Sequence, residues 1–259
     1  MFLLQTGKDD QVLFDFQYEL LESIRQNRWF YRDDEAESFI AVQSFDHFTP
    51  PDDIFVCPVG SIEFVSDYIK KYYADNAFKA AHPMRPINVP TQLLGEEFTG
   101  RFIKKGVTSS ELLKIINDNK NNNYYVKSSV KIKGASGLLY PDNAIHFLAN
   151  TEPGERFDVS EDLGMLRAEW RAFIFNGEIL DVRRYVGGWG ESIDQDFVEK
   201  AVAKWGAKPK ACTLDVAKTD NGRFIVLEGH NFVSCGTYGF SDQNLPRMFV
   251  EGFKWEIKM

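Results

Sequence analysis

Two asparagine-glycine pairs constrain the fold of this 259-residue chain more than any other feature of its sequence. Asn176-Gly177 and Asn221-Gly222 each separate two short apolar runs, and this pattern is the strongest short-range signal of a β-hairpin. Type I′ turns need positive φ at both central residues, which Asn and Gly tolerate best. The chain from residue 167 onward is therefore predicted to form an antiparallel sheet.

The first hairpin gathers charged residues on one face of that sheet. With a two-residue loop, Glu169 faces Arg184, and Arg171 lies diagonal to Arg184. A simple cross-strand salt bridge, which contributes about 0.2–1 kcal/mol, explains the same pattern. The hairpin alone leaves a structural salt bridge and a functional cluster both open.

The second hairpin predicts a metal site. A two-residue loop places Asp215 opposite Glu228, with the side chains about 5 Å apart. The two carboxylates repel each other, and a divalent cation would convert that repulsion into binding. Mg²⁺ is expected because it takes carboxylate oxygens and completes its shell with water and phosphate oxygens. Asn231 can add a neutral oxygen, although a solvated acid at a strand end is the simpler alternative.

A third segment has the composition of a phosphate-binding loop. The expected strand 124–127 ends in Lys127, and residues 128–137 that follow are mostly small and include Lys133. Backbone N–H groups of such a loop can bind anionic oxygens, and both lysines supply positive charge. The loop is not a Walker A motif, because GxxxxGK[ST] is absent. An ordinary hairpin with a basic end has the same appearance.

The N-terminal third is predicted to be a small parallel α/β unit. Its expected elements are a helix over 14–27, strands over 38–42 and 53–57, and a helix over 61–73. Three prolines in residues 82–90 favour extended backbone and mark a domain border. A helix over 109–117 and a strand over 124–128 are expected beyond it.

Charge and cysteine spacing exclude several classes of protein. The net charge of −8 disfavours binding to nucleic acid, which depends on clustered lysine and arginine. The three cysteines are far apart and show no zinc-site spacing. Apolar runs are too short for a membrane span, and the N-terminus becomes polar too early for a secretory signal. A cytoplasmic protein without membrane contact is expected.

Taken in order, these segments resemble the ATP-grasp superfamily, and its amidoligase-type members from bacteria and phages most of all. The resemblance covers approximately residues 101–240. In one departure, relatives usually have Glu-x-Asn at the metal, whereas here His230 stands in the expected slot after Glu228. Asn231 is preferred as the third ligand, reached through a bulge at Gly229, because neutral imidazole suits Mg²⁺ poorly. The similar segments are residues 124–127 with 133–137, 157–163, 169–174 with 176–180, 214–216, 226–228 and 238–239.

The resemblance implies an α+β architecture with the ATP-grasp fold. An N-terminal α/β domain, residues 1–90, would precede two α+β subdomains, residues 91–156 and 157–259, that sandwich the nucleotide. ATP and Mg²⁺ are the implied cofactors, and a carboxylate substrate and an amine acceptor are the implied partners. The implied reaction is ligation of carboxylate and amine through an acyl phosphate, with release of ADP and phosphate. A phosphotransferase on the same scaffold and a noncatalytic nucleotide-binding module are the alternatives.

The resemblance also implies a role for each candidate site residue. Catalytic roles fall on Arg171, Arg184 and Lys133. The metal ligands are Asp215, Glu228 and Asn231. Nucleotide contacts are assigned to Lys127, Lys133, Glu161, Leu163, Glu169, Arg101 and Lys104.

Overall fold

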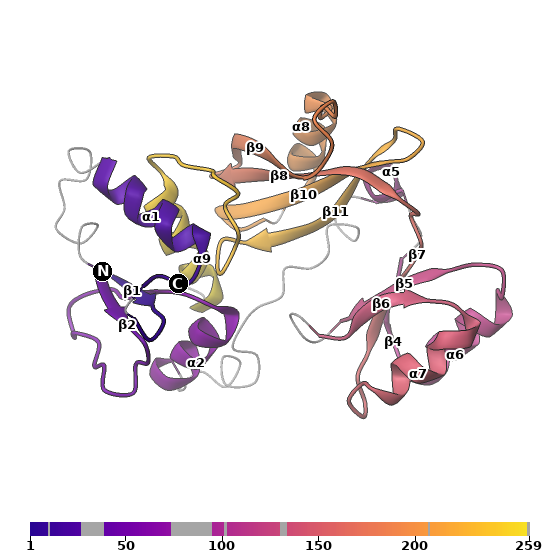
Figure 1. Cartoon of the computed structure of the whole chain (residues 1–259), viewed down its shortest axis with the longest axis horizontal. Helices are drawn as coiled ribbons and strands as arrows, with labels where there is room; N and C mark the ends of the chain where they lie inside the picture. The colour runs from indigo at the N-terminus through magenta and orange to yellow at the C-terminus, as the bar shows by residue number, and fades with distance from the viewer. Residues whose placement is uncertain are drawn as a thin grey trace.

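The computed structural model describes residues 1–9, 11–26, 39–73, 95–100, 103–129, 134–206 and 208–257. These residues form three sheets that follow one another along the longest axis of the molecule (Figure 1). The order along this axis is an N-terminal sheet, a central sheet and a small sheet. In the part of the chain so described, every helix is too short or too polar to cross a membrane.

The N-terminal sheet is parallel, as predicted. Its elements are β1 (Phe2–Gln5), α1 (Asp15–Gln26), β2 (Phe39–Val42), β3 (Cys57–Val59) and α2 (Ile62–Tyr72). The central strand β1 pairs in parallel with β2 and β3. Helix α2 begins at the predicted place because the Ser61 side chain accepts a hydrogen bond from the backbone N–H of Phe64, at 3.1 Å. Strand β3 lies later than the predicted 53–57.

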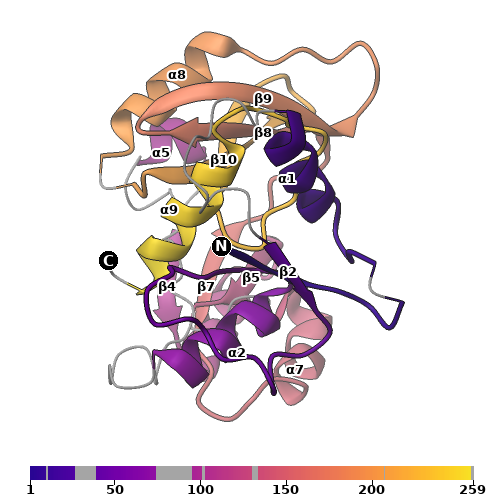
Figure 2. The same ribbon diagram turned by 90° about the vertical axis from the view of Figure 1, so that its left-hand side faces the viewer.

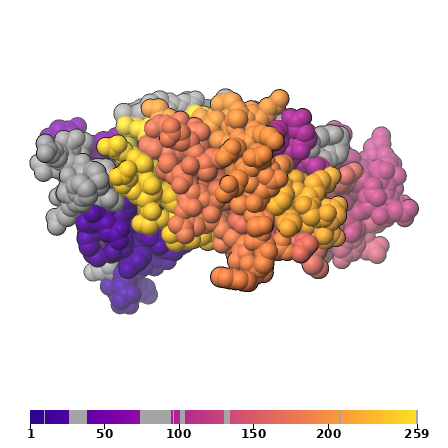
Figure 3. All heavy atoms as spheres, turned by 90° about the horizontal axis from the view of Figure 1, so that it is seen from above, coloured from indigo at the N-terminus to yellow at the C-terminus, as the bar shows by residue number. Residues whose placement is uncertain are grey.

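The core of this N-terminal unit is completed by the C-terminal helix α9 (Leu245–Ile257). Buried residues of β1, α1 and α2 share one apolar cluster with Phe249 and Phe253 of α9. The ring of Phe249 lies 6.1 Å from that of Phe16, and the ring of Phe253 lies 5.9 Å from that of Phe55. Figure 2 shows α9 beside α1, and Figure 3 shows the yellow C-terminal residues against the indigo N-terminal ones. The two ends of the described chain therefore fold into one body.

The central sheet is antiparallel, with the strand order β11-β10-β8-β9. Its strands are β8 (Leu166–Phe175), β9 (Glu178–Gly187), β10 (Ala211–Thr219) and β11 (Phe224–Asn231). One face packs on α8 (Gln195–Lys204) through a cluster that includes Ile174, Leu214 and Trp205. The other face contributes Phe173 and Phe232 to the N-terminal core.

The first predicted hairpin is confirmed at its turn and wrong further along. Asn176 and Gly177 both have positive φ, 50° and 87°, as a two-residue type I′ loop requires. Two irregularities in the β8–β9 ladder then shift the register. Glu169 consequently faces Val186 and not Arg184, which faces Trp170. Each bulge adds one residue to one strand, so every later pair is displaced.

The second hairpin reaches the predicted pair by a different route. Asp215 faces Glu228. The loop, however, has three residues, because the N–H of Thr219 donates to the carbonyl of Arg223 at 2.9 Å. A register shift beside Leu227 restores the offset, since Val216 pairs with Val226. The extra loop residue and the bulge shift the register in opposite directions, so Asp215 still faces Glu228.

The small sheet has the order β4-β7-β5-β6 and is covered on one face by two helices. Its elements are β4 (Ile103–Val107), α6 (Ser109–Asp118), β5 (Tyr124–Ser128), β6 (Ser136–Leu139), α7 (Pro141–Ala149) and β7 (Phe157–Glu161). Thr108 and Glu111 form a capping box at the start of α6. The helix and strand predicted for this region are confirmed.

The predicted borders of the small subdomain, residues 91 and 156, need correction. Strand β7 pairs with both β4 and β5, so this unit extends to Glu161. The short helix α5 (Glu96–Thr99) belongs to the central unit, because Phe98 packs in the cluster that contains α8. The carbonyl of Gly100 also accepts a hydrogen bond from Arg223 at 3.1 Å. The small unit therefore comprises residues 103–161.

Candidate active site

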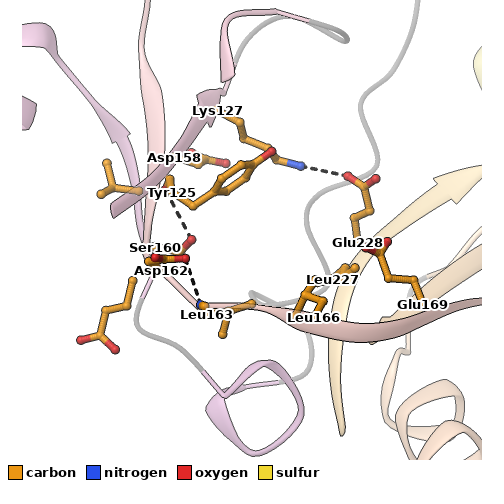
Figure 4. Close-up of a pocket in the computed structure, with 13 residues that line it drawn as sticks. Tyr125, Lys127, Asp158, Ser160, Asp162, Leu163, Leu166, Glu169, Leu227 and Glu228 are labelled. Carbon is orange, nitrogen blue, oxygen red and sulfur yellow. Dashed lines mark hydrogen bonds and ion pairs between the residues drawn. The ribbon is translucent and has the colours of Figure 1, made fainter. Parts of the chain in front are cut away.

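A cavity of about 350 Å³ lies between the small sheet and the central sheet (Figure 4). It is formed by one face of β5 and β7, the segment that connects β7 to β8, and part of β11. Five of the predicted nucleotide or metal residues line it, which brings together parts of the chain about 100 positions apart. These five residues are Lys127, Glu161, Leu163, Glu169 and Glu228.

The segment after β7 forms a fixed turn at the floor of the cavity. The N–H of Asp162 donates to the carbonyl of Asn123 at 3.1 Å. The carboxylate of Asp162 accepts a hydrogen bond from the N–H of Gly164 at 3.0 Å. Gly164 has a φ of 69°, which favours glycine at this position. The turn links the small and central sheets directly.

The cavity has both apolar and charged walls. Tyr125, Leu166 and Leu227 contribute apolar surface, and Figure 4 shows Tyr125 beside Lys127 and the two leucines across from it, on the side of Glu169 and Glu228. Across the cavity, Nζ of Lys127 lies 3.2 Å from Oε2 of Glu228. This ion pair connects β5 of the small sheet to β11 of the central sheet. Apolar and charged groups in one cavity suit a ligand that has both a flat ring and an anionic group.

A group of three potential metal ligands lies next to this ion pair. Ligand atoms of Asp215, Glu228 and His230 all lie within 4.8 Å of one another. Nε2 of His230 is 3.0 Å from Oε1 of Glu228 and 3.6 Å from Oδ2 of Asp215. Burial alone would lower the pKa of His230, but the two carboxylates outweigh burial and raise it to about 10. The imidazole is therefore protonated between the two acids at neutral pH.

Asn231, predicted as the third ligand, lies elsewhere. Gly229 pairs with Leu214 in regular register, so the bulge that was expected to bring Asn231 to the metal does not form there. Successive side chains of a strand point to opposite faces, which turns Asn231 away from Glu228 and His230. The Asn231 amide instead donates to the Glu256 carboxylate on α9. The prediction of Asn231 as a ligand is wrong.

Arg171 is held rigidly against Asp215. Its Nε and one terminal nitrogen donate to the two oxygens of Asp215 at 2.8 and 2.7 Å, and its other terminal nitrogen donates to the carbonyl of Gly236 at 3.1 Å. The rings of Tyr185 and Tyr238 lie over the guanidinium, 5.7 and 5.1 Å from its central carbon. Burial by itself would raise the pKa of Asp215. Hydrogen bonds from Arg171 and the charge of His230 outweigh burial and hold the pKa below its usual value. Asp215 stays ionised although it is buried.

Arg184 lies on the opposite face of the sheet, which contradicts its predicted catalytic place. It donates to the backbone carbonyls of Trp189 and Glu191 at 3.3 and 2.9 Å. The two bulges, both in β9, bring Tyr185 to the site instead, where its hydroxyl donates to Glu169 at 2.8 Å. Because Tyr185 is the next residue in the chain, a one-position shift of register would have identified it.

A similar one-residue error affects the basic residues of β4. Lys104 pairs with Val159, whose side chain is buried under α6 and α7, so Lys104 shares the helix-covered face. The next residue, Lys105, lies in the irregular part of the β4–β7 ladder and interacts electrostatically with Asp158 and Lys127 of the cavity. Burial lowers the pKa of Lys105, Asp158 partly offsets this effect, and Lys127 adds to it. The other two predicted basic residues, Arg101 and Lys133, lie outside the described residues.

Residues 102–248 match the model of a family that is described as an ATP-grasp domain. The matched range includes every strand of the small sheet and of the central sheet, from β4 to β11. No curated protein sequence matched the chain.

Several solved structures share the fold. The ATP-grasp ligase PsnB, in complex with a phosphomimetic variant of its minimal precursor, Mg and ADP, is 12% identical, with a TM-score of 0.54 over 98% of this chain and 97% of its own. The D-cycloserine synthetase DcsG is 12% identical, with a TM-score of 0.55 over 99% and 100%. The D-alanine–D-alanine ligase from Bacillus anthracis, in complex with ATP, is 14% identical, with a TM-score of 0.53 over 99% and 97%. At sequence identities this low, the similarity shows a shared fold and nothing more.

Proposed function

Because the chain belongs to the ATP-grasp family, we propose that it is an ATP-dependent ligase that joins a carboxylate to an amine. The predicted ATP-grasp fold is confirmed by the family match and by the shared fold of the solved ligases. The proposal depends most on one observation. A cavity between two sheets carries Lys127 on one side and Glu228 on the other, and Asp215 faces Glu228 in the neighbouring strand.

The apolar part of the cavity is the proposed site for the nucleotide base. Tyr125, Leu166 and Leu227 provide flat and aliphatic surfaces, and the turn after β7 offers backbone groups near Glu161 and Leu163. A cavity of about 350 Å³ is within the range typical of small-molecule sites. ATP bound in this orientation has its phosphates near Lys127 and Lys105.

The acidic pair fits a divalent cation bound together with the phosphates. The carboxylates of Asp215 and Glu228 face each other, and hard cations such as Mg²⁺ prefer carboxylate oxygens. The solved structure of PsnB with Mg and ADP supports the same pairing of metal and nucleotide in this fold. When bound, the cation supplies positive charge that neutralises the phosphate oxygens during transfer.

The residues of the chain would promote two successive transfers. In the first, the substrate carboxylate attacks the γ-phosphorus, the bond to the β–γ bridging oxygen breaks, and an acyl phosphate and ADP form. In the second, the amine attacks the acyl carbon, phosphate leaves, and the amine loses a proton. Lys127 and Lys105 balance the negative charge of the phosphates. Arg171 acts by holding Asp215, because its nitrogens are already engaged with Asp215 and Gly236.

Calorimetric titration with a nonhydrolysable ATP analogue and a divalent cation tests the nucleotide site. Lys127→Met should weaken binding by about 1.5–3 kcal/mol, or about 10- to 150-fold in Kd, because one charged hydrogen-bond donor is lost. Lys114→Met is the matched control, since Lys114 is an exposed residue of α6 on the far side of the small sheet. No binding to the unchanged chain would refute the proposed site.

Product analysis then separates the ligase from its two alternatives. ADP release that requires both a carboxylate and an amine identifies a ligase. A stable phosphorylated product identifies a phosphotransferase, and tight binding without turnover identifies a noncatalytic module. The cytoplasmic location and the bacterial or phage source expected from the sequence stay predictions.

A further inference from the structure

The third side chain of the proposed metal site is an imidazole. His230 pairs with Thr213 in the β10–β11 ladder and shares one face of the sheet with Asp215 and Glu228. Its Nε2 approaches both carboxylates, at 3.0 Å from Glu228 and 3.6 Å from Asp215. The same ring nitrogen thus reaches the place where a cation shared by the two acids would lie.

A metal at this position would replace the proton that His230 carries between the two acids, and that proton would leave to solvent. Lys127 and His230 contact different oxygens of Glu228, Oε2 and Oε1, so the lysine can keep its ion pair when Oε1 binds a cation. Arg171 fixes Asp215 with one hydrogen bond to each carboxylate oxygen. Oδ2 also lies 3.4 Å from the Tyr185 hydroxyl, and Oδ1 keeps a second lone pair.

The backbone path through this part of β11 is also fixed. A Cβ at Gly229 would lie 2.6 Å from the ring of Trp205, so the strand between the two ligands packs closely on that ring. Asn231, the other candidate ligand, is hydrogen-bonded to Glu256. The local packing therefore presents His230, and not Asn231, beside the acids.

Ligand chemistry distinguishes this set from a typical Mg²⁺ site. Mg²⁺ prefers oxygen ligands and keeps several waters, whereas imidazole nitrogen suits first-row transition metals. We propose that the site binds a first-row transition-metal dication in preference to Mg²⁺, with Nε2 of His230 as its third protein ligand. This inference rests on the proposed function. The specific prediction is coordination of Mn²⁺ by this nitrogen in the complex with nucleotide.

Electron spin-echo spectroscopy of bound Mn²⁺ tests this ligand directly. The full chain is loaded with Mn²⁺ and a nonhydrolysable ATP analogue, and modulation from a coordinated ¹⁴N nucleus is recorded. The unchanged chain should show this modulation, and both His230→Asn and His230→Gln should lose it. His146→Asn, at an exposed histidine of α7, is the matched control and should keep it. The measurement on the unchanged chain is informative by itself, even if a variant fails to fold.

Competition measures the preference for the metal. The ratio of the Mg²⁺ to the Mn²⁺ dissociation constant should fall by about tenfold or more in His230→Asn, because metal affinity commonly changes by at least this factor when a supporting group is removed. Bound Mn²⁺ without ¹⁴N modulation, or an unchanged ratio, would overturn the assignment of His230 and leave the proposed function intact. Absence of both Mn²⁺ and nucleotide binding would overturn both.

Discussion

The buried pair of Arg171 and Asp215 allows a quantitative test of how the site is held together. The two residues are only 7% and 2% exposed, and two hydrogen bonds of 2.8 and 2.7 Å join them. Replacing either partner leaves a buried charge without its main counter-ion, which typically costs about 3–5 kcal/mol of unfolding free energy. Two hydrogen bonds to charged groups, at about 1.5–3 kcal/mol each, give a similar figure.

The neighbours predict which single variant is worse. Arg171→Met leaves Asp215 with Nε2 of His230 at 3.6 Å and the Tyr185 hydroxyl at 3.4 Å, so its charge stays partly compensated. Asp215→Leu leaves a buried guanidinium with a carbonyl and two tyrosine rings but without a carboxylate. Asp215→Leu should therefore lower the unfolding free energy at least as much as Arg171→Met.

The double variant Arg171→Met/Asp215→Leu should recover most of the lost stability, since apolar replacement of a buried ion pair is often neutral or stabilising. Urea unfolding followed by circular dichroism measures all three variants. Lys70→Met is the control, because Lys70 forms an exposed ion pair with Asp67 and should change stability by less than about 1 kcal/mol. The reasoning would be refuted if each single variant lost less than about 1 kcal/mol of unfolding free energy. It would also be refuted if the loss in the double variant equalled the sum of the two single losses.

Three further predictions concern a helix cap, a close contact and the ion pair across the cavity. Thr108→Ala should destabilise the protein by about 1 kcal/mol in urea unfolding, because α6 loses its N-cap. Hydrogen bonds from Thr108 lower the pKa of Glu111, so the contribution of this carboxylate is present above its unfolded pKa and disappears as the pH falls through the lower folded value. Thr108→Ala keeps the backbone N–H that lowers this pKa most and loses only the hydroxyl. A pH titration by NMR should therefore find the pKa of Glu111 partly raised, and an unchanged value would contradict the hydrogen bond from the hydroxyl. Gly229→Ala should destabilise by about 1–3 kcal/mol in thermal unfolding, since its Cβ would lie 2.6 Å from the buried ring of Trp205. Lys127→Met should weaken nucleotide binding but change the unfolding free energy by less than about 1 kcal/mol from that of the unchanged chain. The effect on stability is small because the partner Glu228 is 39% exposed and can be hydrated.

Local signals identified several turns, helices and strands correctly. The turn at Asn176-Gly177 needs only two residues that tolerate positive φ, and the sequence provides both. Helix α6 and strand β5 lie at or within one residue of the predicted positions, because the capping pattern of Thr108 and Glu111 and a short apolar run are sufficient to define them. Such features depend on interactions within a few residues, which a single sequence contains.

Side-chain placement along the strands depended on interactions that the sequence does not contain. The register shifts in the β8–β9 ladder leave no local signal in the sequence, and they exchange Arg184 for Tyr185 at the site. Lys104 and Lys105 differ by one position, and only the pairing of β4 with β7 places Lys104 on the helix-covered face. The pair Asp215 and Glu228 was predicted because two errors of one residue cancelled.

The position of α9 in the N-terminal core has a consequence for folding during protein synthesis. The strands of the sheet β2-β1-β3 leave the ribosome before the other two sheets, but Phe249 and Phe253, which complete its core, belong to the last of the described elements. The unit of residues 103–161 has its own apolar cluster and can close before them. The usual order, in which the N-terminal domain folds first, is therefore reversed here. The apolar surface of β1 and β3 that packs against α9 is therefore expected to stay uncovered on the nascent chain until α9 emerges.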